Sequence, residues 1–257
     1  MGKVYFCIMK SLQSVSQQIR IPFLVALMGT FFSGVVLDVT HNQNPLALVL
    51  GFIMIFLGYV FTRTAGPAVV FSQTFIFYAT AFVVCGFLAF VIQGWELVYK
   101  FAAITILGIL YNWKISPIKI RSIPFIKALY VGLVWALVIS WMLPQTFLYR
   151  VFVLVFLLIS ALVLLSDIRD QNRDQVSTFA NTLGIRNTQI LIYCFLAISL
   201  FHLFGDMKKE FHLAMGLTIL LILFLTACST WLHKHPAFTL ALELSVGFPA
   251  FIYWIVP

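Results

Sequence analysis

Acidic residues are scarce in this sequence of 257 residues, where Asp and Glu together number 8 against 16 Lys and Arg. Charged residues make up only 9% of the chain, hydrophobic residues make up 62%, and the mean hydropathy is +1.05. Too few polar side chains are present to cover the surface of a water-soluble globule of this length. The composition therefore excludes a soluble globular protein and predicts an all-α, polytopic membrane protein.

Ligand-type cysteine spacing and a targeting segment are also missing. Cys7, Cys85, Cys194 and Cys228 form no CxxC pattern, so we interpret them as small hydrophobic residues. Residues 1–20 lack the charged, apolar and cleavage-site order of a secretory signal, and no targeting peptide is expected. The net charge of +8 would suit nucleic acid, but its cations lie in short loops between apolar runs, where they meet lipid headgroups instead. We expect no nucleic-acid partner.

Apolar runs close to the length that a helix needs to span a bilayer recur along the chain. They lie at 21–37, 45–62, 70–92, 97–111, 125–143, 147–166, 188–204, 211–231 and 237–256. The sequence therefore predicts nine transmembrane helices in a single domain that covers residues 1–257.

The loops between these runs predict the orientation in the membrane. Twelve of the 16 Lys and Arg fall at the N-terminus and after the second, fourth, sixth and eighth runs, and the remaining four fall on the opposite side. Those four are Lys100, Arg150, Lys208 and Lys209. By the positive-inside rule, the N-terminus lies in the cytoplasm and the C-terminus lies outside a membrane of the cytoplasmic type.

Three of the eight acidic residues lie in one short stretch, DIRDQNRD, from Asp167 to Asp174, directly after an apolar run. If this stretch continues the preceding helix, all three aspartates, with Asp170 in the middle, fall within about 60° of one another. Arg169 and Arg173 then point the other way. Carboxylates on one stripe raise each other's pKa unless a cation lies between them, which favours a divalent metal site. Pairing of these acids with the neighbouring arginines is the alternative.

The second polar feature is the loop YNWKISPIKIRSIPFIK between the fourth and fifth runs. Pro117 and Pro124 keep it from forming one uninterrupted helix. Its cations include Lys119, Arg121 and Lys127, which taken alone fit headgroup anchors equally well. Because this loop and the aspartates share a predicted side, carboxylates for metal and cations for phosphate would meet at the mouth of a helix bundle. A lipid diphosphate requires both kinds of group at such a place.

The segment DIRDQNRDQVSTFANTLG, residues 167–184, resembles the second aspartate-rich motif of the UbiA superfamily of intramembrane prenyltransferases, with its DxxDxxxD pattern and trailing Thr and Leu-Gly. The stretch LYNWKISPIKIRSIPFIKALYVGLVWA resembles the connection between that family's fourth and fifth helices. Order, spacing, predicted side and number of runs agree across nearly the whole chain. The resemblance implies a bundle of nine helices around a central cavity, where a prenyl group passes from its diphosphate to an acceptor and Mg²⁺ is held by two aspartate-rich motifs.

The resemblance also implies roles for particular residues and the partners of the protein. It assigns Mg²⁺ binding and catalysis to Asp167, Asp170 and Asp174, and phosphate contacts to Lys119, Arg121 and Lys127. The implied partners are a prenyl diphosphate lipid, an acceptor that the sequence does not identify, and the bilayer itself.

The sequence departs from the family at the first aspartate-rich motif, which should fall near GYVFTRTAGP, residues 58–67. No Asn, Asp or Glu occurs there, and Tyr59 and Arg63 lie one helical turn apart instead. A guanidinium holds phosphate oxygens directly in a fork geometry. We therefore expect an asymmetric diphosphate site, with metal on the aspartate side and Arg63, helped by Tyr59, on the other. The alternative is that Arg63 anchors its helix end to headgroups.

Two further candidates lie near the C-terminus. Glu243 falls a few residues inside the ninth run, and a carboxylate within a membrane indicates function because burying it is costly. His233 and His235 form an HxH pattern, which fits a metal site but is more often part of a polar linker. Two functions stay open: a prenyltransferase, or a non-catalytic relative that binds or moves an isoprenoid phosphate without cleaving it.

Overall fold

The structure is a computed structural model, and it is entirely helical, without strands, in the ranges that it describes. These ranges are 2–40, 44–64, 73–112, 123–143, 147–171, 178–204, 207–232 and 235–256, without the side chains of 2–19, 63–64, 73–77, 112 and 124–125. The helices are α1 (Gly2–Val39), α2 (Pro45–Thr64), α3 (Gln73–Gln93), α4 (Trp95–Asn112), α5 (Pro124–Leu137), the π-helical turn η3 (Val138–Met142), α6 (Tyr149–Arg169), α7 (Phe179–Leu203), α8 (Lys209–Leu232), α9 (Pro236–Ser245) and α10 (Phe248–Ile255). Each apolar run predicted from the sequence overlaps one of these helices, or a consecutive pair of them, over most of its length.

Among the described residues, five helices are long and apolar enough to cross a membrane, which agrees with the prediction of a membrane protein. They are Arg20–Val39 of α1, Pro45–Thr62 of α2, and the whole of α6, α7 and α8. The pair α9 and α10, bent by 63°, makes a sixth if it counts as one broken span. Helices suit this composition because a helix satisfies its own backbone hydrogen bonds where water is absent. The finer count of nine crossings stays a prediction.

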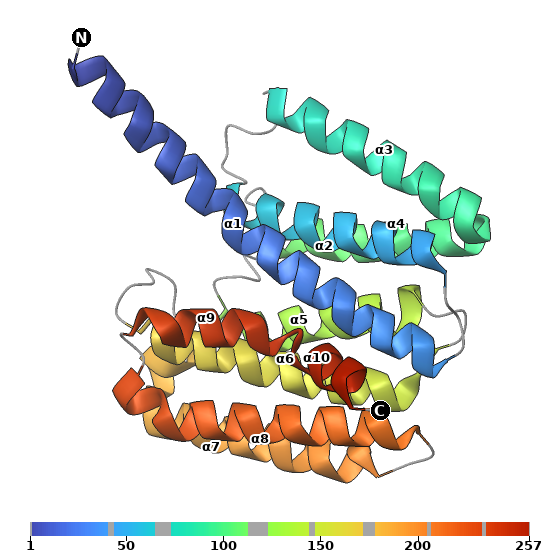
Figure 1. Ribbon diagram of the computed structural model, residues 1–257, viewed down its shortest axis with the longest axis vertical. Helices are drawn as coiled ribbons and strands as arrows, with labels where there is room; N and C mark the ends of the chain where they lie inside the picture. The colour runs from blue at the N-terminus through green and yellow to red at the C-terminus, as the bar shows by residue number, and fades with distance from the viewer. Residues whose placement is uncertain are drawn as a thin grey trace.

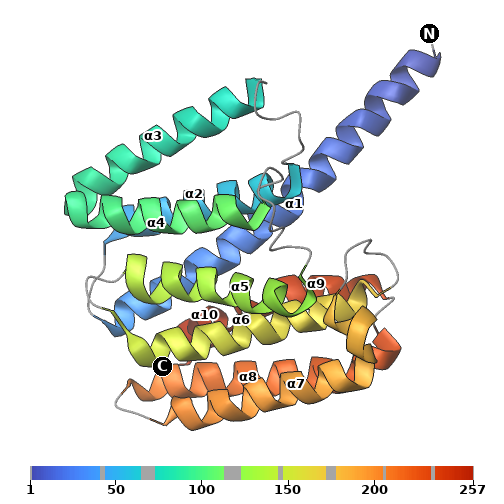
Figure 2. The ribbon, with the colours of Figure 1, turned by 180° about the vertical axis from the view of Figure 1, so that it is seen from behind.

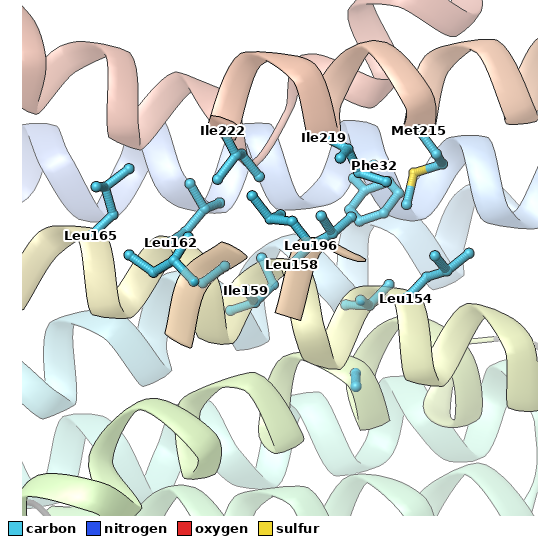
Figure 3. Close-up of a cluster of buried hydrophobic side chains, with 14 of the residues drawn as sticks. Phe32, Leu154, Leu158, Ile159, Leu162, Leu165, Leu196, Met215, Ile219 and Ile222 are labelled. Atoms are coloured by element: carbon cyan, nitrogen blue, oxygen red, sulfur yellow. The ribbon is translucent and has the colours of Figure 1, made fainter. Parts of the chain in front are cut away.

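Two hydrophobic cores hold the bundle together. The larger core contains buried side chains of α1 and of α5 through α10 (Figure 3), and the smaller core joins α1 with α2, α3, α4 and η3. In Figures 1 and 2, α1 passes between the two groups, with α2 to α4 on one side and α6 to α8 on the other. Trp135 of α5 packs against both cores. The buried side chains of each core, mainly leucine, isoleucine, valine and phenylalanine, pack closely against one another. This packing holds the helices, and therefore their ends, in fixed relative positions.

Two glycines allow unusual backbone arrangements, one where α5 packs against the middle of α6 and one early in α7. A Cβ atom placed on Gly132 of α5 would lie 2.7 Å from the carbonyl oxygen of Phe156 in α6, and closer still to the Ser160 hydroxyl. Only glycine lets these helices approach so closely. Gly184 has φ +81° and ψ 165°, a conformation that side-chain-bearing residues rarely adopt, and it kinks α7 one turn after its start.

Candidate functional site

Five charged side chains from three helices gather where α6 ends. Lys127 comes from the first turn of α5, Asp167, Arg169 and Asp170 come from the end of α6, and Glu243 comes from α9. Ion pairs join them from helix to helix, and we call these five residues the charged cluster. The end of α6 and the start of α9 lie at the same end of the bundle (Figure 1). Carboxylates and cations therefore meet at this place. Four of the five residues were candidates from the sequence, and Arg169 is the one that was expected to point away.

The most deeply buried member of the charged cluster is Asp167, which is only 1% exposed. Its Oδ1 accepts a hydrogen bond from Lys127 Nζ at 2.6 Å. An ionised carboxylate away from water costs several kcal/mol unless a counter-charge and hydrogen bonds replace its hydration. Lys127 thus supplies the charge that allows Asp167 to stay ionised inside the bundle. The resemblance assigns Lys127 to a phosphate contact, whereas in this structure Lys127 pairs with the Asp167 carboxylate.

Arg169 links the rest of the charged cluster. Its Nε and Nη2 donate to the two carboxylate oxygens of Asp170 at 2.8 and 2.5 Å, and its Nη1 lies 3.9 Å from Glu243 Oε1. Tyr59 of α2 is close enough to interact electrostatically with the same guanidinium. The Arg169 and Glu243 side chains are 15% and 14% exposed, so water only partly screens these charges. One side chain therefore connects α6 with α9 and extends toward α2.

The single stripe of aspartates was predicted on the condition that this stretch continues the preceding helix, and the described residues do not meet that condition. Helix α6 ends at Arg169, and Asp170 is the C-cap residue with φ −91° and ψ 9°. The spacing of three and seven residues therefore does not by itself place the three carboxylates on one helical face. Arg169 also does not point away from them, since its long side chain turns back to Asp170 at the helix end. Asp174 lies outside the described residues.

Asp167 and Asp170 are the described carboxylates to which the resemblance assigns Mg²⁺. Within the described ranges, no three His, Cys, Asp or Glu side chains gather closely enough to hold a metal ion. Mg²⁺ is, however, commonly bound through only one or two carboxylates, with substrate phosphates completing its octahedron. Asp167 and Asp170, three residues apart where α6 ends, supply hard oxygen donors of the required kind. The residues therefore fit a metal ion that arrives together with a phosphate.

The other predicted site residues are only partly covered by the structure. Tyr59 and Arg63 both belong to α2, so they do lie one helical turn apart, but the Arg63 side chain is outside the described set. Lys119, Arg121 and His233 also lie outside the ranges that the structure describes. His235 Nδ1 accepts a hydrogen bond from the backbone N–H of Ala237 at 3.2 Å, and this bond caps α9. The linker interpretation of the HxH pattern accounts for that histidine.

The sequence did not predict a second polar group at the opposite end of the bundle. Tyr253 of α10 donates to Asp38 Oδ2 of α1 at 2.6 Å, and Lys208 Nζ lies 3.1 Å from the same oxygen. Lys208 also bonds the Asp38 carbonyl at 3.3 Å and the Tyr253 hydroxyl at 3.4 Å. An acid and a base at two ends of different apolar runs were the only sequence signal. These three residues, Asp38, Lys208 and Tyr253, come from distant parts of the chain. We call them the outer triad because they lie at the end of the bundle away from the charged cluster.

Removing Lys208 from the outer triad is expected to lower the thermal stability of the protein by an amount that depends on pH. The hydrogen bond that the Lys208 ammonium donates to the Asp38 carboxylate raises the pKa of Lys208 above its ordinary value of 10.5. Because this pKa is higher in the folded state, the stabilisation is complete below pH 10.5 and is lost as the pH rises through the folded-state pKa. Lys208→Met should therefore lower the thermal midpoint by about 2 to 4 °C at pH 8, and by progressively less as the pH rises through the folded-state pKa of Lys208. A shift that stays the same from pH 8 to the highest pH at which the protein is folded would show that the charge of Lys208 does not matter.

No protein family model matches this chain, and no match is found among curated proteins or among solved structures. The class of protein is therefore defined by the fold and the site alone. The chain is an all-helical protein with several apolar helices of membrane-spanning length. Its distinguishing feature is a largely buried group of ion pairs at one end of the larger core.

Proposed function

We propose that the charged cluster binds the diphosphate group of an isoprenoid lipid and that the protein transfers the prenyl group to an acceptor. The observation that carries the proposal is the placement of Lys127 and Arg169, two largely buried cations, at the end of an apolar bundle. Apolar helices suit an isoprenoid chain, and a guanidinium beside an ammonium suits phosphate oxygens. The resemblance to UbiA prenyltransferases points to the same chemistry.

In this proposal Lys127 and Arg169 exchange their carboxylate partners for the phosphate oxygens of the lipid. Carboxylate and phosphate are both oxyanions. The bidentate hydrogen bonding of Arg169 to Asp170 is the geometry with which arginine also binds phosphate. When a diphosphate takes over Lys127 and Arg169, Asp167 and Asp170 lose their counter-charges. Buried carboxylates in that state are unfavourable by several kcal/mol, so a divalent cation must enter with the lipid. The proposal therefore couples lipid binding to Mg²⁺.

The chemistry proposed at the charged cluster is displacement of diphosphate from an allylic carbon. The bond between that carbon and the diphosphate oxygen breaks, its electron pair leaves with the oxygen, and the acceptor bonds the carbon and loses a proton. Lys127 and Arg169 stabilise the negative charge that develops on the leaving oxygens. Bound Mg²⁺ supplies further neutralisation of that charge. In this proposal Asp167, Asp170 and Asp174 would hold the metal, and Arg63 with Tyr59 would form the second wall of the site.

A non-catalytic lipid binder is the second candidate, and a specific observation favours it. Each described carboxylate of the charged cluster already has a cation as partner, and α2 offers no acid to make a second metal site. Such a protein would bind the isoprenoid phosphate and keep it intact.

Release of diphosphate separates these two functions. The purified protein is incubated with an allylic prenyl diphosphate and Mg²⁺, and free diphosphate is measured, with a parallel sample in which EDTA removes the metal. A prenyltransferase releases diphosphate in the presence of Mg²⁺ once a suitable acceptor is added, and loses this activity in EDTA. Recovery of intact lipid bound to the protein under all conditions, with a panel of aromatic and isoprenoid acceptors, would support the binder instead.

The proposal also includes nine membrane crossings with the charged cluster on the cytoplasmic side. The uneven distribution of Lys and Arg supports this orientation. A reporter inserted within residues 113–122 should then be active only in the cytoplasm, and one fused after residue 257 only on the outer side. Cytoplasmic activity from both fusions would contradict the odd number of crossings.

A further inference from the structure

A cavity of about 390 Å³ opens where α6 begins and α7 ends, far from the charged cluster at the other end of α6. Five residues line it: Tyr149, Arg150, Phe201, His202 and Phe204. Its volume lies within the range of small-molecule sites. Because α6 has the length of a membrane span, its two ends lie at the two faces of the bilayer, so the cavity lies at the level of lipid headgroups.

The aromatic part of the lining is unusually exposed. Phe204 is 80% exposed, Phe201 is 77% exposed and Tyr149 is 62% exposed. Three such rings around one opening would be unfavourable in water but are typical of the membrane interface, where aromatic side chains contact both headgroups and acyl chains. The Phe201 and His202 rings meet edge to face with centroids 5.7 Å apart, which orients the imidazole beside the opening.

The polar part of the lining is basic. Arg150 is exposed in the first turn of α6, and within the described part of the chain it makes no ion pair. His202 can donate a hydrogen bond from its ring, and none of the five lining residues is acidic. A guanidinium near an imidazole, surrounded by interfacial aromatic rings, is complementary to a phosphate monoanion that carries an apolar body.

We infer that this cavity binds the headgroup of an anionic phospholipid in the leaflet opposite the charged cluster. Arg150 holds the phosphate oxygens, His202 donates a further hydrogen bond, and Tyr149, Phe201 and Phe204 cover the glycerol and the first carbons of the acyl chains. This site is independent of the proposed transfer reaction, because its residues and its leaflet are different.

Native mass spectrometry of the protein released from nanodiscs tests this inference. Nanodiscs contain equal amounts of phosphatidylglycerol and phosphatidylcholine, and retained lipid is counted for each species. The parent protein should retain phosphatidylglycerol in preference, and Arg150→Gln should lower this retention about fivefold, the worth of one basic residue at a lipid surface. His202→Gln should lower it less. Lys209→Gln is the matched control, because Lys209 is an exposed cation at the same end of the bundle that does not line the cavity.

Three outcomes would overturn the inference. Equal retention of the two lipids by the parent protein would show that no anionic headgroup is recognised. An equal loss in Arg150→Gln and Lys209→Gln would show a general attraction of cations for the membrane surface. Complete displacement of phosphatidylglycerol by millimolar inorganic phosphate would show a site for soluble phosphate, since a lipid anchored by its acyl chains competes far better than the free ion.

Discussion

Replacing Lys127 with Met is expected to lower the free energy of unfolding by about 3 kcal/mol, because removing one partner of a buried ion pair leaves the other charge without its compensation. Asp167 is 1% exposed, so water cannot readily replace the ammonium group. The methionine keeps most of the side-chain volume, and the loss therefore reflects charge rather than packing. Reversible unfolding in mixed micelles, followed by circular dichroism, measures the change.

The double variant Lys127→Met with Asp167→Leu shows whether the pair itself is responsible. Apolar replacement of both partners removes the unpaired charge, and it should recover most of the stability lost in the single variant. Lys100→Met is the control, since its partner Glu96 is 58% exposed and stays hydrated when the lysine is gone. That change should cost less than about 1 kcal/mol. A double variant as unstable as Lys127→Met, or more so, would contradict a specific pair between Lys127 and Asp167.

Replacing Asp170 with Asn is expected to weaken Mg²⁺-dependent binding of a prenyl diphosphate by at least about tenfold, while the fold stays intact. The amide has nearly the shape of the carboxylate but neither its charge nor its capacity to hold a metal ion. The Asp170 side chain is 29% exposed at a helix end, so a neutral residue is tolerated there. Binding is measured by titrating the lipid against detergent-purified protein at several Mg²⁺ concentrations.

Glu210→Gln is the matched control for this titration. It removes one negative charge from the first turn of α8, which lies at the end of the bundle opposite the charged cluster, and it should leave binding unchanged. If Asp170→Asn binds the lipid as tightly as the parent at every Mg²⁺ concentration, Asp170 serves only as the partner of Arg169. Loss of folded protein in this variant would instead favour a structural role for the acids.

The helices were predictable because each requires only a local property, a run of apolar residues long enough to cross a bilayer. A basic residue near Asp167 was also predictable, since Lys127 lies in the first turn of the helix that follows the basic loop. The pair between Arg169 and Asp170 corresponds to the alternative in which the acids pair with neighbouring arginines. The contact between different helices was not predictable in the same way. The contact of Arg169 with Glu243 depends on how α6 and α9 pack, and the sequence spacing between two helices does not carry that information.

The end of α6 shows why the spacing of the aspartates was not enough to predict a shared helical face. A spacing of three and seven residues indicates one face only while the helix continues, and Asp170 already departs from helical geometry. No glycine or proline stands at that point in the sequence to mark the end. The outer triad was missed for a related reason: Asp38 and Lys208 are 170 residues apart and meet only because α10 packs against both α1 and α8.

A structure of the protein in nanodiscs with Mg²⁺ and an unreactive prenyl thiodiphosphate tests the central proposal most directly. We expect phosphate oxygens within hydrogen-bond distance of Lys127 Nζ and of the Arg169 guanidinium, with the pairs to Asp167 and Asp170 opened and the two carboxylates turned to the metal. The isoprenoid chain should extend from there between the apolar helices. A lipid bound elsewhere, with both of these ion pairs unchanged, would contradict the assignment of the charged cluster as a diphosphate site.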